Sequence, residues 1–68
     1  MSIEILVNGE PAAAPDGQTV LGLLRDLGLD PTHVAVELDR RIIKQPDWSA
    51  TVLIPGARLE IVQFVGGG

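Results

Sequence analysis

The segment Thr19-Val20-Leu21-Gly22-Leu23-Leu24-Arg25-Asp26-Leu27-Gly28 decides the fold, because it carries a helical pattern in a chain otherwise rich in strand patterns. Its apolar residues recur at i, i+3, i+4 and i+7, which predicts one buried stripe: Val20, Leu23, Leu24 and Leu27. Thr19 can cap this helix, Gly28 suits a left-handed C-terminal cap, and Asp30-Pro31 prevents continuation. Gly22 inside the helix either allows a close approach to a sheet or is a tolerated defect.

Strand patterns flank this helix on both sides. Residues 3–7 and 10–14 are predicted to pair around Asn8-Gly9, a dipeptide that tolerates the positive φ angles of a tight hairpin. Pro11 lacks a backbone donor, so the second of these strands is expected at a sheet edge. Further strands are expected at residues 33–38, 41–44 and 58–65. An α+β fold follows, with one helix packed across one face of a mixed sheet of four or five strands.

The last strand is expected at the centre of the sheet, parallel to the first, and its side chains alternate between two faces. Leu59 and Ile61 are expected to face the helix. The other face is expected to carry Glu60, Val62 and Phe64. An irregular crossing precedes this strand, and Trp48 within it is expected to seal the core.

The composition excludes several classes of protein. A chain of 68 residues allows one domain, and 46% hydrophobic residues is too high for intrinsic disorder. The five basic residues are scattered among nine acidic ones, which disfavours nucleic-acid binding. The absence of cysteine excludes a disulfide scaffold, and no apolar run is long enough to span a membrane. The N-terminus lacks the pattern of a signal peptide, so a cytoplasmic location is expected.

Residues for enzymatic chemistry are sparse. His33 is the single histidine, and without cysteine it provides neither a nucleophile–base pair nor a metal cluster. We expect it to be a solvated loop residue. The carboxylates are spread over the whole chain, and a domain this short has little room for a concave pocket. The sequence therefore predicts that the protein is not an enzyme and holds no metal.

The C-terminus is the most distinctive chemical feature. A domain spanning residues 1–65 is expected to end in a flexible tail, Gly66-Gly67-Gly68, whose residues have no side chains to pack. No helix follows these glycines, so they do not form a phosphate-binding loop. Such a strip can thread a narrow channel and present its ionised carboxylate to another protein's active site. A frayed terminus is the alternative interpretation.

Five features of the chain occur in a familiar order: Asn8-Gly9, Gly17-Gln18-Thr19-Val20, Val34-Ala35-Val36-Glu37-Leu38, Trp48, and Ile61-Val62-Gln63-Phe64-Val65-Gly66-Gly67-Gly68. Together they resemble the ThiS family, the sulfur carriers of thiamine biosynthesis, which have a ubiquitin-like β-grasp fold. The resemblance covers the whole chain, and the terminal Phe-Val-Gly-Gly-Gly is its most specific part. Asp39-Arg40 departs from the family, which often has a glycine turn at that point.

The resemblance implies a carrier protein. In the family, a partner adenylyltransferase uses ATP to convert the terminal carboxylate, here that of Gly68, to an acyl-adenylate. Sulfur from a persulfide donor then displaces AMP, and the thiocarboxylate so formed supplies thiazole synthase. Gly66 and Gly67 are expected to thread the partner's channel. No cofactor is expected on the chain itself, because the partner is the protein that uses ATP.

Val62 and Phe64 are expected to form a docking patch beside the tail, with Phe64 as an aromatic anchor. A single exposed apolar residue can instead fold over local surface. The expected sheet has no second layer on this face, which favours docking.

Three other functions remain open. A molybdopterin-synthase small subunit is also a β-grasp protein with a terminal Gly-Gly, although the shorter chain and the Phe-Val-Gly-Gly-Gly ending favour thiamine. A ubiquitin-like modifier would be joined to lysines of a target protein. A plain interaction module would show no chemistry at its terminus.

Overall fold

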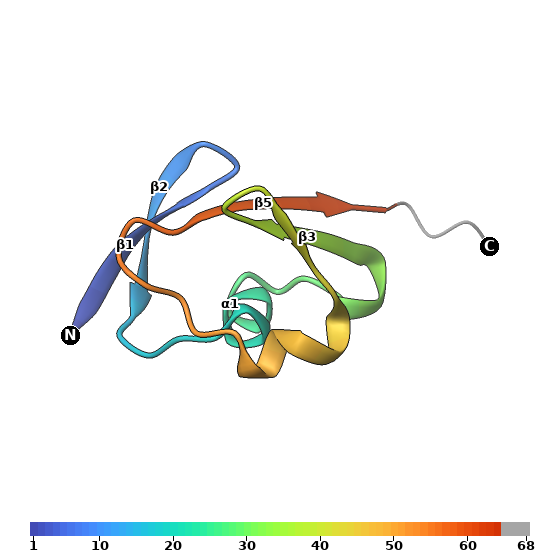
Figure 1. Cartoon of the computed structure of the whole chain (residues 1–68), viewed down its shortest axis with the longest axis horizontal. Coiled ribbons are helices and arrows are strands. Elements are labelled where there is room, and N and C mark those ends of the chain that lie inside the picture. Colours follow the sequence, from blue (N-terminus) through green and yellow to red (C-terminus); the bar gives the residue numbers. More distant parts are fainter. Residues whose placement is uncertain (65–68) are drawn as a thin grey trace.

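The computed structural model describes residues 1–64 and confirms a mixed five-stranded sheet with one α-helix packed against it (Figure 1). Along the chain the elements are β1 (Ser2–Val7), β2 (Glu10–Pro15), α1 (Val20–Asp26), the 3₁₀ helix η1 (Pro31–His33), β3 (Val34–Leu38), β4 (Arg41–Ile43), the 3₁₀ helix η2 (Gln45–Ala50) and β5 (Arg58–Gln63). The strand order is β2-β1-β5-β3-β4. As predicted, β5 is central and parallel to β1. On its other side β5 is antiparallel to β3. This is the architecture of the ubiquitin-like β-grasp fold.

Two tight turns join the antiparallel strand pairs. Asn8 and Gly9 have φ angles of 52° and 82° and connect β1 to β2, the edge strand that Pro11 predicted. Asp39 and Arg40 also have positive φ angles, 50° and 71°, and connect β3 to β4 without a glycine. The Asp39 carboxylate accepts from the Arg58 N–H at 3.0 Å, and the Asp39 N–H donates to the Arg58 carbonyl at 2.8 Å. These bonds to β5 offset the backbone strain of the second turn.

Helix α1 begins as predicted and ends at Asp26, one residue before Leu27, the last residue of its predicted apolar stripe. The Thr19 hydroxyl accepts from the Gly22 N–H at 3.1 Å. At the other end, Gly28 has a φ of 72°, and its N–H donates to the Arg25 carbonyl while the Leu29 N–H donates to the Leu24 carbonyl, a Schellman motif. The prediction that Leu27 is buried is wrong, because 47% of it is exposed. The turn at Gly28 carries the chain back, so that Leu29 packs against the core instead.

The side chain of Gln18, and not the sheet, lies closest to Gly22 within α1. A Cβ atom on Gly22 would collide with Oε1 of Gln18. The Gln18 side chain passes over this position and donates to the Asp26 carboxylate at 2.6 Å. A close approach to the sheet is therefore not the reason for this glycine.

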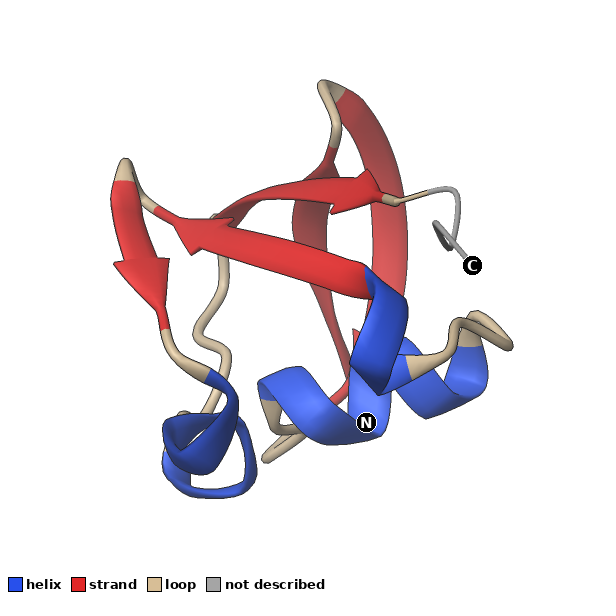
Figure 2. Cartoon of the chain, turned by 90° about the vertical axis from the view of Figure 1, so that its right-hand side faces the viewer, coloured by secondary structure: helices blue, strands red, loops and turns tan. Residues whose placement is uncertain are grey.

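The core lies between α1 and the concave face of the sheet, and Figure 2 shows the helices grouped on that side. Its buried residues come from nearly every element: Ile5, Ala14, Val20, Leu23, Leu24, Val34, Val36, Trp48, Leu53, Ala57 and Leu59. Trp48 is only 2% exposed and donates from Nε1 to the Ile43 carbonyl at 2.8 Å, which confirms its predicted packing role. The crossing around it is not irregular as expected, because it forms η2. None of the helices in residues 1–64 is long and apolar enough to cross a membrane.

Candidate functional site at the end of strand β5

Strand β5 is the last strand of the sheet along the chain and ends at Gln63 (Figure 1). Phe64 follows this strand and is the last described residue. The predicted tail, Gly66, Gly67 and Gly68, lies outside the described residues. The candidate site is therefore the strand end that delivers the tail, together with the surface around it.

Strand β3 holds this end of β5 from one side. The two strands pair in register from Leu38 opposite Leu59 to Val34 opposite Gln63. One further bond continues the pairing, because the Phe64 N–H donates to the His33 carbonyl at 2.7 Å. Backbone pairing therefore reaches the last described residue.

Asn8 holds β5 from the other side. Strand β1 pairs with β5 only at Leu6 opposite Arg58 and Val7 opposite Leu59. Beyond that point the Asn8 carboxamide takes the place of a strand residue: its Oδ1 accepts from the Ile61 N–H at 2.7 Å, and its Nδ2 donates to the Ile61 carbonyl at 3.2 Å. The sequence indicated only a turn residue here. The preference of hairpins for Asn-Gly explains the turn, and no local signal reveals a bond across 53 positions.

Val62 and Phe64 lie where the alternation placed them. They are 58% and 52% exposed, whereas Leu59 on the other face of β5 is 1% exposed. Ile61 packs against the core as expected. The docking role of Val62 and Phe64 stays a prediction.

His33 belongs to a small polar cluster beside Phe64. Its Nδ1 lies 2.8 Å from Oδ2 of Asp30, and both side chains are about half exposed, at 46% and 53%. Hydrogen bonds from the backbone N–H and the hydroxyl of Thr32, and then from His33, lower the pKa of Asp30 from 3.8 to about 2. Asp30 caps η1, and His33 is the last residue of this 3₁₀ helix. The predictions that His33 begins a strand or lies in a loop are therefore wrong, although its side chain is half exposed to solvent. In residues 1–64, no three His, Cys, Asp or Glu side chains are grouped to hold a metal ion.

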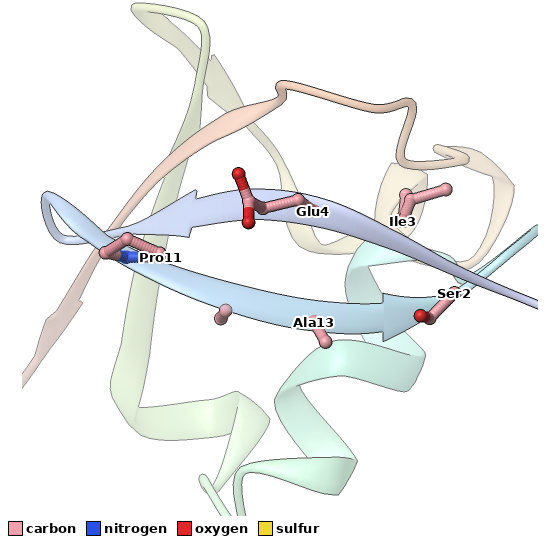
Figure 3. Close-up of a pocket in the computed structure, with 6 residues that line it drawn as sticks. Ser2, Ile3, Glu4, Pro11 and Ala13 are labelled. Carbon is pink, nitrogen blue, oxygen red and sulfur yellow. The ribbon is translucent and has the colours of Figure 1, made fainter.

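A hollow with a volume of about 360 Å³ opens over the β1–β2 hairpin (Figure 3). Its lining comprises Ser2, Ile3, Glu4, Pro11, Ala12 and Ala13. Glu4 is the one ionisable side chain among them, so this hollow offers no acid–base pair for catalysis.

Comparisons with known proteins agree on one family. The model of the ThiS family matches residues 5–68. The thiazole synthases of Magnetococcus marinus and Paramagnetospirillum magneticum are 41% and 36% identical to the chain over 66 residues, or 97% of its length. The chain spans about a fifth of the length of these relatives, 20% in each case. The crystal structure of the thiamine biosynthesis protein ThiS from Geobacter metallireducens superposes with a TM-score of 0.82 at 29% identity, covering 97% of this chain and 100% of that one.

Proposed function

The chain belongs to the ThiS family, and on this premise we propose that it is a sulfur carrier for thiazole formation in thiamine biosynthesis. The observation that carries the proposal is the extent of the family match, which runs through the terminal glycines to Gly68. The solved ThiS structure adds support, because its whole length aligns with this chain. In this function the protein is a carrier and not an enzyme.

The proposed chemistry takes place at the Gly68 carboxylate. A carboxylate is a poor electrophile because oxide would have to leave. A partner adenylyltransferase would join this carboxylate to the α-phosphate of ATP, with release of pyrophosphate, and AMP would then be a good leaving group. The outer sulfur of a persulfide donor would displace AMP and form an acyl disulfide with the donor. A thiol acting as reductant would then cleave the S–S bond and become a disulfide itself, leaving a thiocarboxylate that thiazole synthase consumes. ATP would be bound by the partner, and this chain would need no cofactor of its own.

The described residues would hold the start of the tail in a defined position. Strand β5 is held by the His33 carbonyl on one side and by the Asn8 carboxamide on the other, so the tail starts from a fixed point. Gly66 and Gly67 lack side chains and would fit a narrow channel of the partner. Val62 and Phe64, exposed on the same strand end, would dock on the partner's surface.

The test is the intact mass of the protein after incubation with the adenylyltransferase, ATP and a sulfur source. The parent protein should show the mass increase of one oxygen replaced by sulfur, located in the C-terminal peptide. One residue added after Gly68 moves the carboxylate by up to about 3.5 Å and should abolish the conversion. Gly67→Val should also be converted poorly, because a β-branched side chain restricts the backbone and adds bulk.

A variant with one residue added before Met1 is the matched control, and it should acquire sulfur like the parent. All three variants should unfold at the same denaturant concentration as the parent. If the C-terminally extended protein acquires sulfur without being trimmed first, the proposed carrier chemistry is wrong.

A further inference from the structure

A second surface hollow lies on the outer face of the sheet, the face opposite α1. It spans β3, β4 and β5 and has a volume of about 130 Å³. The residues that line it are Ala35, Val36, Glu37, Ile42, Glu60 and Val62. We call this hollow the outer-face trough. A volume of this size accommodates one side chain, whereas a helix is about 10–12 Å across.

The trough has an apolar floor. Ile42 is 76% exposed and Val62 is 58% exposed, although both are large aliphatic residues. The β3–β5 register places Ala35 directly opposite Val62, and the β3–β4 register places Glu37 opposite Ile42. Aliphatic side chains gathered on an exposed sheet face are typical of a surface that another molecule covers.

Two carboxylates border this floor. Glu37 and Glu60 are directly opposite each other on neighbouring antiparallel strands, where Cβ atoms are about 4.5–5.5 Å apart. Like charges in this position destabilise a sheet. Within residues 1–64 the one ion pair closer than 4.0 Å joins His33 to Asp30, so neither glutamate has a cationic partner at that distance. Arg58 is two positions before Glu60 on the same strand and does not pair with it.

An apolar floor with two carboxylates at its border is complementary to a side chain that has a methylene stem and a cationic head. We propose that the outer-face trough receives one lysine or arginine side chain of the protein that adenylates Gly68. Its stem would lie on Ile42 and Val62, and its head would lie between Glu37 and Glu60. The inference rests on the proposed function, because it takes the adenylating protein as the occupant.

The position of the trough supports this choice of occupant. Glu60 and Val62 belong to β5, and Val62 is two residues before Phe64, where the described chain ends. A protein that grips the tail and contacts Phe64 would therefore cover the trough as well. The unmodified carboxylate must meet the adenylating protein before any later partner, so that protein is the first that has to recognise this surface.

The experiment compares two double variants that remove the same charge. Glu37→Gln/Glu60→Gln neutralises the trough, while Glu4→Gln/Glu10→Gln removes two exposed carboxylates from β1 and β2. Binding to the adenylyltransferase of the same organism is measured by titration calorimetry at low and high salt. The trough variant should bind at least tenfold more weakly than the control at low salt, and its affinity should depend less on salt. Its unfolding midpoint should equal or exceed that of the parent, because a like-charge pair is removed.

Equal affinities of the two double variants would overturn the inference. So would a trough variant whose only change is in self-association, since the occupant would then be a second copy of this chain. Ile42→Ser offers an independent check, because it removes the floor and keeps both charges, and it should also weaken binding.

The mass measurement separates this inference from the proposed function. If the parent acquires sulfur and the trough variant binds normally, the carrier function stands and the trough assignment is wrong. If the parent acquires no sulfur, the carrier function itself fails.

Discussion

The two faces of strand β5 differ sharply in their exposure to solvent. Leu59 points toward α1 and is 1% exposed, while Val62, three residues later, is 58% exposed on the outer face. Figure 2 shows the helices on one side of the sheet, and in residues 1–64 no element covers the other side. Strand β5 thus contributes Leu59 and Ile61 to the core and leaves its other side chains exposed. Substitutions on β5 should therefore separate stability from function.

Truncation of the inner face should have the largest effect. Leu59→Ala removes buried methyl groups beneath α1 and should lower the free energy of unfolding by about 2–5 kcal/mol, much of the stability of so small a domain. Val62→Ala on the outer face is the matched control and should change the free energy of unfolding by less than about 0.5 kcal/mol. Urea denaturation measures both values. Similar losses for the two variants would contradict the division of β5 into two faces.

A charge on the outer face should affect binding and leave the fold intact. Phe64→Glu should weaken binding to the adenylyltransferase or to thiazole synthase by about 2 kcal/mol or more, because an aromatic anchor is lost. The free energy of unfolding should stay unchanged, since Phe64 is outside the core. Ile54→Glu provides the control, because Ile54 is 62% exposed and lies in the segment before β5, whereas Phe64 follows that strand. Normal binding by Phe64→Glu would show that Phe64 is not part of the docking surface.

The hydrogen bonds between Asn8 and the edge of β5 should contribute less to stability than the packing of Leu59 on its inner face. Asn8→Gly keeps the positive φ angle of the turn and deletes both hydrogen bonds to Ile61, so it should cost about 1 kcal/mol of stability. Hydrogen exchange at the Ile61 amide should become faster. Asn8→Asp retains the acceptor and should preserve part of that protection. Unchanged exchange in Asn8→Gly would mean that the carboxamide does not hold the strand.

The smallest effect is expected at the Asp30 cluster, which includes His33, the hydrogen-bond partner of the Phe64 N–H. The pKa of Asp30 is about 2 in the folded protein, below the ordinary 3.8, so its ionised form favours folding. This contribution is fully present above pH 3.8 and is lost as the pH falls through about 2. Carbon NMR titration of the Asp30 carboxyl measures the pKa directly. Thr32→Val removes one donor, and an unchanged Asp30 pKa in that variant would refute the hydroxyl's contribution.

Much of the fold follows from local patterns. The apolar spacing at Val20, Leu23 and Leu24, the Asn8-Gly9 turn and the alternation of β5 correctly predict the helix, a hairpin and the two faces. Leu27 is the exception. Its spacing fits the buried stripe, but the Schellman motif ends the helix and places Leu29 against the core, an outcome that periodicity does not encode.

The surroundings of the candidate site were less predictable. The sequence identified Val62 and Phe64 as exposed, since alternation along a strand is a local property. It did not identify Asn8 as a partner of Ile61, or Glu37 as the neighbour of Glu60. These pairs join residues far apart in the chain, and their contacts depend on how the strands align.

The sequence by itself determined the strands, the helix α1, the inner and outer residues of β5 and the glycine ending, because each depends on neighbours a few positions apart. Only the tertiary structure decided the register of β5 between β1 and β3, and with it the Asn8 bonds and the outer-face trough. The physical reason is that register is set by packing of the whole inner face against α1 and Trp48, and a shift of one residue would turn every side chain of β5 to the opposite face.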